Sequence, residues 1–201
     1  MGRIQSSCSQ CRREKEKLFL KGEKCVSSKC PVEKRKYPPG QHGAAITRLT
    51  EYGRRMREKQ KARRMYGLTE RQFRNYFEKA AKTKAATGQK LMELLERRLD
   101  NVVFRLGFAP SRQAARQLVH HGNIVVNSRK VNVPSFEIKI NDIVKLKAKM
   151  LERIGEKLKE YVPPAWLVMN ADQTGTVSRL PKKDDTERLI EESAIVEYYS
   201  R

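Results

Sequence analysis

The sequence lacks the features that would place a chain in a membrane or send it for export. No apolar run in its 201 residues approaches the ~20 residues that a membrane-spanning helix needs. The stretch from Met1 to Ser6 contains no continuous apolar segment, so we expect no signal peptide. Hydrophobic residues make up 38% of the chain, which is low but above the level of a disordered chain. We therefore expect a cytoplasmic protein without a membrane partner, built from one or two domains with cores of their own.

Acidic residues are few for the number of basic ones. The chain has 44 Lys and Arg against 23 Asp and Glu, which gives a formal net charge of +21. Such an excess costs the folded state self-repulsion, so it indicates that a polyanion is the expected partner. Nucleic acid is the commonest polyanion that proteins bind, and phosphate contacts supply most of the binding free energy. The alternative, a merely solvated surface, is disfavoured because ordinary small domains carry a much smaller net charge.

Composition divides the chain into three predicted domains. All four cysteines lie in the N-terminal part, a strongly basic helical sequence follows, and a mixed pattern of helix and strand comes next. The acidic C-terminal part should avoid phosphates, so we expect it to fold back onto the basic helices. The predicted boundaries are 1–43 for the cysteine segment, 44–90 together with 181–201 for the helical domain, and 91–180 for the mixed domain.

Hydrophobic spacing and turn residues predict the individual elements. Two basic helices are expected at roughly 48–65 and 70–84, with Thr69 as the second N-cap. A third helix is expected from Leu91 to Leu106, because apolar residues recur there at three- and four-residue steps, and Gly107 should end it. Ser111 should cap a further helix, which runs to His121 and ends at Gly122. Short strands are predicted at 124–126, 130–133, 136–140, 143–146 and 175–178, with tight turns at 127–128 and 141–142.

The C-terminal segment has a predicted conformation and a predicted set of buried side chains. Residues 184–201 contain 6 acidic and 2 basic residues. We expect a helix here, although a short strand from Ala194 to Tyr198 is an alternative. The side chains expected to be buried are Leu189, Ile190, Ile195 and either Tyr198 or Tyr199.

The four cysteines form two close pairs within residues 8–30. The spacing Cys8-x-x-Cys11 and Cys25-x-x-x-x-Cys30 can bring four thiolates to one tetrahedral ion, as in a structural zinc site. Neighbouring Lys and Arg side chains would stabilise the net negative charge of such a centre. Zinc is favoured, and a four-iron four-sulfur cluster is the alternative metal centre. Disulfides, which need an oxidising compartment, and unliganded thiols are the two remaining interpretations.

The helix from Ser111 to Gly122 has a polar side without any acid. Arg112, Arg116 and His120 lie four residues apart and form one stripe, and Gln113, Gln117 and His121 form the next. An ordinary solvated helix mixes Glu with Arg, so this pattern favours phosphate contact. Two adjacent histidines point to different sides of a helix, so at most one of them should meet a phosphate.

Several motifs together resemble those of a known family. Residues 97–108 and 111–127 resemble the small RNA-binding module first defined in small-subunit ribosomal protein S4, which some pseudouridine synthases and tyrosyl-tRNA synthetases also contain. The cysteine segment, the stretch from Tyr37 to Gly43, residues 54–66 and 70–73, and the C-terminal Glu197 to Arg201 extend the resemblance to the whole chain. Asn141 is a departure, because many relatives have glycine there. Asn tolerates a left-handed turn, so no functional inference changes.

The resemblance implies a fold and a function. The fold class is α+β: an N-terminal metal-bound segment, a helical domain, and a mixed domain with an antiparallel sheet, packed helices and the RNA-binding module at about residues 97–160. Family members bind the 5′ domain of 16S rRNA, nucleate assembly of the 30S subunit and influence translational accuracy. They lie beside ribosomal proteins S3 and S5, near the place where mRNA enters the subunit. The resemblance also implies a ribosomal location, no small-molecule substrate, and a metal in members with four cysteines.

Two other classes of function are less consistent with the sequence. An RNA-modifying enzyme could use the same module, but no acid, base or nucleophile stands at suggestive spacing outside it, so we expect no catalytic residues. A zinc-containing DNA-binding regulator would need a dimer-forming surface, and the sequence contains no heptad seam. The metal ligands are predicted to be Cys8, Cys11, Cys25 and Cys30. The predicted RNA-binding residues are Arg12, Arg13, Arg35, Lys36, Arg48, Arg54, Arg55, Arg57, Lys59, Lys61, Arg63, Arg64, Arg71, Arg105, Ser111, Arg112, Arg116, Gln117, His120 and His121.

Overall fold

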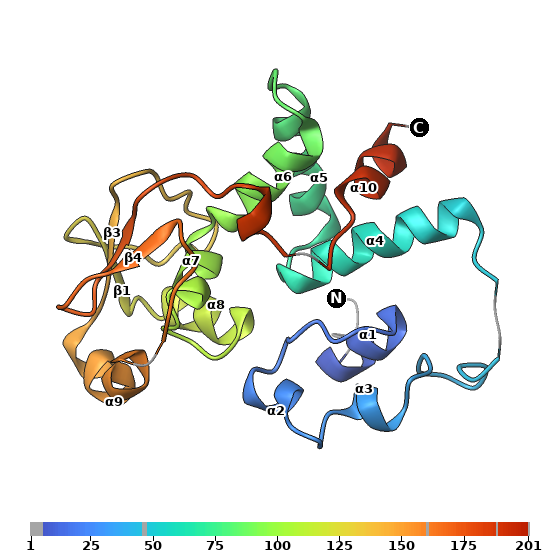
Figure 1. Cartoon of the computed structure of the whole chain (residues 1–201), viewed down its shortest axis with the longest axis horizontal. Helices are drawn as coiled ribbons and strands as arrows, with labels where there is room; N and C mark the ends of the chain where they lie inside the picture. The colour runs from blue at the N-terminus through green and yellow to red at the C-terminus, as the bar shows by residue number, and fades with distance from the viewer. Residues whose placement is uncertain (1–5, 46–47, 160, 188, 201) are drawn as a thin grey trace. The chain divides into compact units, whose positions relative to one another are not determined.

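The chain has two compact units in the computed structural model, which describes residues 6–45, 48–159, 161–187 and 189–200 (Figure 1). Unit 1 comprises residues 1–73 and 190–201, and unit 2 comprises residues 74–189. Helices and an antiparallel sheet occur together, which confirms the predicted α+β class. None of the described helices is long and apolar enough to cross a membrane. Arg201, the last residue of the C-terminal motif, lies outside the described part of the chain.

Unit 1 begins with three short helices that carry the cysteines. They are α1 (Ser7–Glu14), α2 (Glu23–Val26) and α3 (Pro31–Lys34). Helix α1 begins where the side chain of Ser6 accepts a hydrogen bond from the Ser9 backbone N–H. Helix α3 begins with Pro31, and the missing N–H of proline loses no helical hydrogen bond at that position. Few apolar side chains are buried here beside the cysteines, chiefly Leu18, Leu20 and Val32. This part of the unit therefore has only a small hydrophobic core.

Two longer helices follow, as the sequence predicts. Helix α4 (Glu51–Met65) is capped by Thr50, whose hydroxyl accepts a hydrogen bond from the Gly53 N–H at 3.1 Å. Helix α5 (Glu70–Ala81) begins with a reciprocal pair of bonds between Thr69 and Gln72, at 3.3 and 3.2 Å. The predicted N-cap at Thr69 is therefore confirmed. The division between the two units falls within α5.

The C-terminal segment folds back onto α4 as helix α10 (Glu192–Tyr199), which confirms the predicted helix and rules out the alternative strand. Ile195 is fully buried and Ile190 is 8% exposed, as expected. The prediction for Leu189 was wrong, because its side chain is 39% exposed. Residue 190 begins the part of the chain that packs in unit 1, so Leu189 lies just before the packed segment.

The predicted helix from Leu91 to Leu106 is two helices in unit 2. Helix α6 (Thr87–Glu96) and helix α7 (Leu99–Arg105) are separated by Arg97 and Arg98. The predicted strand at 136–140 is also absent among the described strands. Both errors have one cause, because these two segments pair with each other. The Ile138 N–H donates to the Arg97 carbonyl at 3.0 Å and the Leu99 N–H to the Phe136 carbonyl at 2.9 Å, so the helix is interrupted.

The sheet of unit 2 has five antiparallel strands in the order β2-β1-β3-β5-β4. The predicted strands β1 (Ile124–Val126), β3 (Ile143–Leu146) and β5 (Gly175–Val177) are confirmed, whereas β2 is shorter and earlier (Arg129–Lys130) than predicted. Asn127 and Ser128 between β1 and β2 both have positive φ, as a two-residue hairpin turn requires. Asn141 adopts φ +66°, the predicted left-handed turn. Strand β4 (Leu167–Met169) and helix α9 (Ala148–Lys159) were not predicted.

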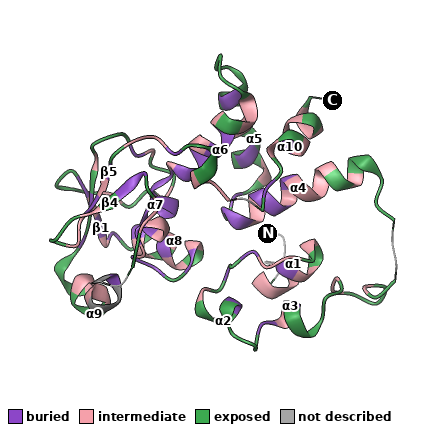
Figure 2. Ribbon diagram, viewed as in Figure 1, coloured by how far each residue is buried: buried purple, intermediate pink, exposed green. Residues whose placement is uncertain are grey.

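One face of this sheet is covered by apolar side chains of α7 and of helix α8 (Arg112–His120). Ser111 caps α8 as predicted, because its hydroxyl accepts a bond from the Ala114 N–H at 3.3 Å. Gly122 has φ +66°, which allows its N–H to reach the Val119 carbonyl and end the helix. Figure 2 shows the buried residues gathered between α7, α8 and the strands. The short 3-10 helix η1 (Lys183–Asp185) contacts α6.

The packing of α10 on α4 generates a stability prediction. Ile195→Ala removes a fully buried side chain and should lower the free energy of unfolding by about 2–5 kcal/mol. Leu189→Ala is the matched control and should change it by less than about 0.5 kcal/mol, because Leu189 is exposed. Urea denaturation followed by far-ultraviolet circular dichroism measures both. Equal losses for the two variants would contradict the packing of the C-terminal helix.

Candidate RNA-binding surface and cysteine cluster

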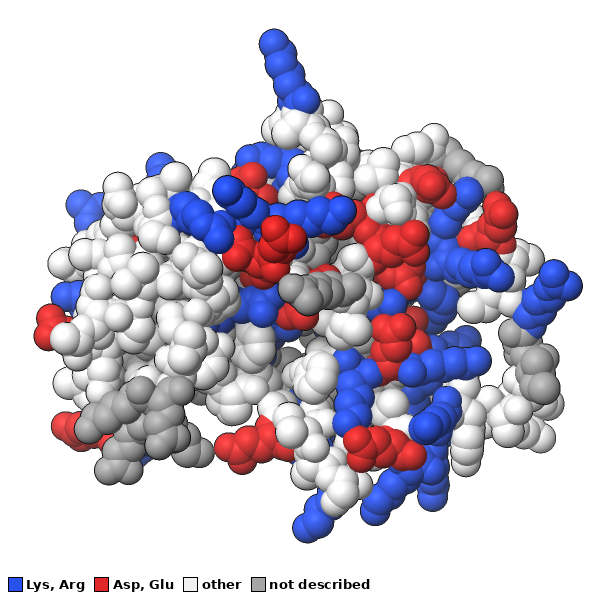
Figure 3. Space-filling view, in the orientation of Figure 1, with Lys and Arg blue, Asp and Glu red and all other residues white. Residues whose placement is uncertain are grey.

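Nine of the predicted RNA-binding residues are exposed and therefore accessible to a polyanion. Figure 3 shows Lys and Arg side chains in many places on the visible face, interspersed with acidic ones. In unit 1 the exposed residues occur before α4, on α4 and on α5, and in unit 2 they occur at the C-terminal end of α8. They are Arg13, Arg35, Lys36, Arg48, Arg54, Arg71, Gln117, His120 and His121.

Three of the predicted RNA-binding residues are buried in the fold. Lys59 and Lys61 are only 4% and 6% exposed, and Ser111 is 6% exposed. The Lys61 ammonium lies 2.7 Å from Glu58 and 3.0 Å from Glu16, and Ser111 serves as the cap of α8. A buried ammonium must be paired because desolvation of an isolated charge is costly. These side chains therefore have structural contacts within their own unit.

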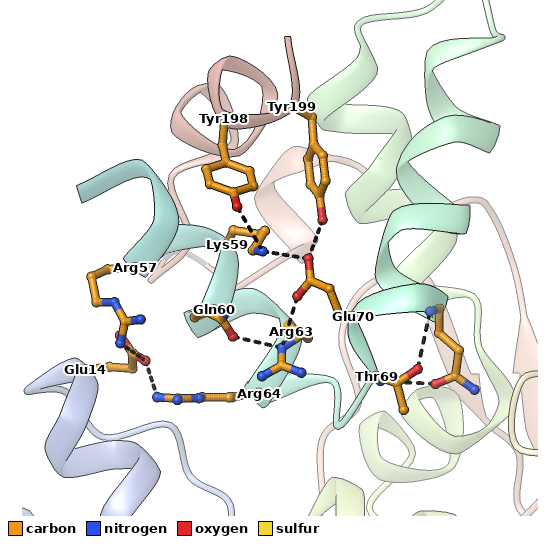
Figure 4. A network of polar contacts seen from close by, with 11 residues as sticks. Glu14, Arg57, Lys59, Gln60, Arg63, Arg64, Thr69, Glu70, Tyr198 and Tyr199 are labelled. Carbon is orange, nitrogen blue, oxygen red and sulfur yellow. Dashed lines mark hydrogen bonds and ion pairs between the residues drawn. The ribbon is translucent and has the colours of Figure 1, made fainter. Parts of the chain in front are cut away.

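Glu70 is the centre of a polar network that joins α4, α5 and α10 within unit 1 (Figure 4). Its Oε1 accepts hydrogen bonds from the Lys59 ammonium at 2.6 Å and from the Tyr199 hydroxyl at 3.0 Å. The Lys59 ammonium also lies 4.5 Å from the centre of the Tyr198 ring. Burial alone would raise the pKa of Glu70, but the hydrogen bonds and charges of its partners, Lys59 first, lower it below its usual value.

A second shared carboxylate joins the cysteine-bearing segment to α4. Glu14 lies at the end of α1, its side chain is 1% exposed, and it forms ion pairs with Arg57 at 3.4 Å and with Arg64 (Figure 4). Its Oε2 has no hydrogen-bond partner among the described residues. Burial therefore raises the pKa of Glu14, and the positive charges of Arg57 and Arg64 oppose this shift only in part.

Arg12, another predicted RNA-binding residue, is used to hold the chain between α3 and α4. Its Nε donates a hydrogen bond to the Tyr37 carbonyl at 3.1 Å, and its guanidinium lies 5.1 Å from the centre of the Tyr37 ring. Arg55 and Arg63 on α4 are half-buried and also have acidic partners, Glu197 at 2.7 Å and Glu70 at 3.7 Å respectively. Six of the seven basic side chains of α4 thus form ion pairs with acids of the same unit.

The polar side of α8 contains no acidic residue of its own, but the fold brings an acidic residue from another segment against it. Arg112 donates to the Glu187 carboxylate at 2.6 Å and to Asn101 at 2.8 Å, and its guanidinium lies 4.6 Å from the centre of the Phe104 ring. Arg105 reaches the same Glu187 at 3.0 Å. An RNA phosphate can therefore reach this pair of arginines only by replacing Glu187 or by sharing them with it.

The remaining arginine of this stripe is less tightly held. Arg116 is 35% exposed, and its Nε lies 4.0 Å from Asp100, which is itself paired with the buried Arg98 at 2.8 Å. Arg105 also forms a two-point contact with the fully buried Glu96, at 2.9 and 3.0 Å. The exposed Gln117, His120 and His121 complete the surface at the end of the helix.

Sequence reasoning missed the carboxylates that hold the arginines. Glu14, Glu70 and Glu187 were not singled out, although each is bonded to two basic side chains. A capping position signals Glu70, which follows Thr69 at the start of α5. No local signal could have found Glu187, because 75 positions separate it from Arg112.

The four cysteines line one small cavity of unit 1. Cys8 and Cys11 lie one turn apart on α1, Cys25 lies on α2, and Cys30 is the N-cap of α3. All four are free thiols, and three of them are at most 8% exposed. Among the described residues, no group of three or more potential ligands is close enough to hold one metal ion. The structure thus brings the predicted ligands together without forming a complete ligand set.

Backbone donors point at two of the sulfur atoms. The Lys21 N–H donates to the Cys25 Sγ at 3.3 Å, and the backbone of Leu18 donates to Cys11. Burial raises the pKa of Cys11, the Leu18 hydrogen bond opposes this, and the three neighbouring cysteines raise the pKa further. In the absence of a positive ion, the Cys11 thiol therefore resists ionisation, whereas a bound cation would reverse the effect.

Comparison with known proteins gives matches along almost the whole chain. The family model described as the ribosomal protein S4/S9 N-terminal domain matches residues 3–96, and the S4 domain model matches residues 97–144. The small ribosomal subunit protein uS4 of Dictyoglomus turgidum is 53% identical over 198 residues, 96% of this chain and 96% of that protein. The uS4 protein of Syntrophomonas wolfei is 49% identical over 209 residues, 100% of both chains. The protein uS4A of Symbiobacterium thermophilum is 51% identical over 201 residues, 96% of both.

The Glu70 network predicts a specific pH dependence. Because the folded pKa of Glu70 is lowered, its contribution is complete above the unfolded pKa of about 4.3 and is lost as the pH falls through the folded value. Glu70→Gln should therefore lower the free energy of unfolding at neutral pH, and the difference from the unchanged protein should shrink in acid. Glu78→Gln is the control, because its exposed pair with Arg74 contributes little. A Glu70→Gln deficit that stays constant from neutral to acid would contradict the role of this carboxylate.

Proposed function

The chain belongs to the uS4 family of small ribosomal subunit proteins, and from this we propose how it acts as a structural constituent of the subunit that binds 16S rRNA. The observation that carries the mechanism is the division of its basic residues. Buried lysines and half-buried arginines have acidic partners inside each unit, and a separate exposed set remains for phosphate. Such contacts fix position on folded RNA through shape and charge, without base-specific chemistry.

A more specific site in the subunit is part of the proposal. The family resemblance supports early binding to the 5′ domain of 16S rRNA, nucleation of subunit assembly and an influence on decoding accuracy. It also supports contacts with ribosomal proteins S3 and S5 and with mRNA where it enters the subunit. The acidic residues Glu191 and Glu197 are exposed at α10, and phosphates would be repelled there. We therefore propose that this end of the chain faces protein.

Two variants of α4 test the division of basic residues. Arg54 is exposed and Lys59 is 4% exposed, so Arg54→Gln and Lys59→Gln remove the same charge from the same helix at different depths. Arg54→Gln should weaken binding to a 5′-domain fragment of 16S rRNA and reduce the slope of log K against log salt by about one. Filter binding over a series of salt concentrations measures both quantities.

The second variant serves as the matched control. Lys59→Gln should lower the thermal stability of the protein, because Glu70 loses its closest cation, and it should leave the salt slope unchanged. Both titrations are carried out at a temperature at which circular dichroism shows each variant folded. Equal reductions in the salt slope for the two variants would contradict the proposed division of basic residues. They would mean that RNA binding depends on the net charge and not on the position of each charge.

We also propose that the cysteine segment holds one structural metal ion, with zinc favoured over a four-iron four-sulfur cluster. Four free cysteines line one cavity, two of them accept backbone N–H bonds, and the small apolar core of this segment needs further stabilisation. The ligands would be Cys8, Cys11, Cys25 and Cys30. A bound zinc ion would supply folding free energy and no catalysis, because four thiolates leave no open position.

Metal content tests this second proposal directly. Freshly purified protein should contain one zinc per chain by elemental analysis, and Cys11→Ser should lower both the zinc content and the stability of unit 1. Ser28→Ala, an exposed change between Cys25 and Cys30, is the control and should retain the metal. A brown protein with visible charge-transfer absorption would show that the metal centre is the iron-sulfur cluster and not zinc. Stable, folded protein without metal would overturn the proposal.

A further inference from the structure

Unit 1 contains a groove of about 470 Å³ beside the cysteine segment. Three parts of the chain form its walls: the C-terminal end of α1, residues 38–43, and the N-terminal half of α4. Its volume lies within the ~300–1,000 Å³ that pockets for small ligands usually have. The groove is therefore large enough to take one nucleotide. Neither Glu14 nor Glu70 is among its lining residues.

The charge of this groove is of one sign. Of the residues that the structure describes, Arg13, Lys15 and Arg57 line it, and no aspartate or glutamate does. A neighbouring groove of unit 1, of about 460 Å³, shares these three cations but is also lined by six glutamates. In a chain whose basic residues so often have acidic partners, an acid-free groove of comparable size favours an anionic ligand.

The floor of the groove is largely apolar. Pro38, Pro39, Leu49 and Met56 contribute to it, and Gly53 adds a stretch of α4 without a side chain. A flat apolar wall next to cations suits a molecule with an aromatic ring and a negative group.

Lys15 holds an unusual backbone conformation at the edge of this groove. It ends α1 with φ +60°, in the left-handed region that glycine normally occupies, and its N–H donates to the Arg12 carbonyl at 3.2 Å. Its side chain is exposed. Non-glycine residues in such conformations cluster at binding sites, where the surrounding structure holds them in place.

We propose that this groove binds one unstacked nucleotide from a single-stranded segment of RNA. The base packs against the prolines and Met56, and the phosphate is held by Arg13 and Lys15. Arg57 contributes less, because its guanidinium already faces Glu14 at 3.4 Å. The inference rests on the proposed RNA-binding function and goes beyond it, since an electrostatic surface alone needs no pocket for a base.

Methyl resonances of methionine provide the test in the whole chain as purified. Protein with carbon-13-labelled methionine methyl groups is titrated with adenosine monophosphate and, separately, with inorganic phosphate. Adenosine monophosphate should shift the Met56 methyl resonance through the ring current of the base, whereas phosphate should not. Met92, which is 1% exposed in unit 2, is the internal control and should not respond to either. Equal effects of the two ligands on Met56, or no effect of the nucleotide, would overturn the proposal.

A pair of double variants tests the phosphate contact. Arg13→Gln with Lys15→Gln should weaken nucleotide binding by about tenfold or more, because charge-assisted hydrogen bonds are lost. Lys145→Gln with Lys147→Gln removes the same charge from exposed positions of unit 2 and should not weaken it. Equal weakening by both pairs would overturn the site.

The rRNA fragment separates this proposal from the proposed function. Binding of the fragment should also shift the Met56 methyl resonance. If the fragment binds with the expected salt dependence but leaves Met56 unmoved, the groove is not a nucleotide site although the protein binds RNA. If the fragment does not bind at all, the proposed function fails, and the inference that rests on it fails too.

Discussion

With a net charge of +21, the chain folds against its own electrostatic repulsion, and carboxylates shared between two cations reduce that repulsion inside each unit. Glu14 pairs with two arginines of α4, Glu70 with Lys59 and Arg63, and Glu187 with Arg105 and Arg112. In each case one acid serves two bases, which leaves the protein strongly positive. Helix α4 can therefore pack although most of its polar residues are basic.

This arrangement also separates structural from functional cations. A lysine such as Lys59, held by a carboxylate and two tyrosine rings, would lose those contacts if it turned towards RNA. Exposed residues such as Arg71 have no such cost. The arginines near Glu187 are intermediate, because a phosphate there competes with a carboxylate that is already in place. Affinity for RNA thus depends on where each positive charge lies as well as on how many there are.

The cysteine-bearing part of unit 1 depends on the same principle. Its apolar core is small, and the buried Glu14 with its two arginine partners joins α1 to α4. The burial of an incompletely bonded carboxylate has an energetic cost, so this contact gives orientation more than stability. That cost is consistent with a need for the proposed metal ion, which would add the free energy that the core does not supply.

Local interactions account for what the sequence determined by itself. Thr69 and Ser111 cap helices, Gly122 ends one, and Asn141 adopts a left-handed turn, because each effect involves only neighbouring residues. The α+β class and the motifs of the RNA-binding module were predictable for the same reason. The cysteine spacing also predicted a shared location for the four thiols, although their metal remains a proposal.

Contacts between distant parts of the chain decided the rest. Helicity stops at Arg97 and Arg98 because residues 136–138 pair with the backbone there, and no local pattern signals that pairing. Lys59 is buried because α10, more than 130 positions away, supplies Tyr198. The acid-free side of α8 meets Glu187 only in the folded chain. A sequence reports the number of its charges, but only the tertiary structure decides which of them remain exposed to bind RNA.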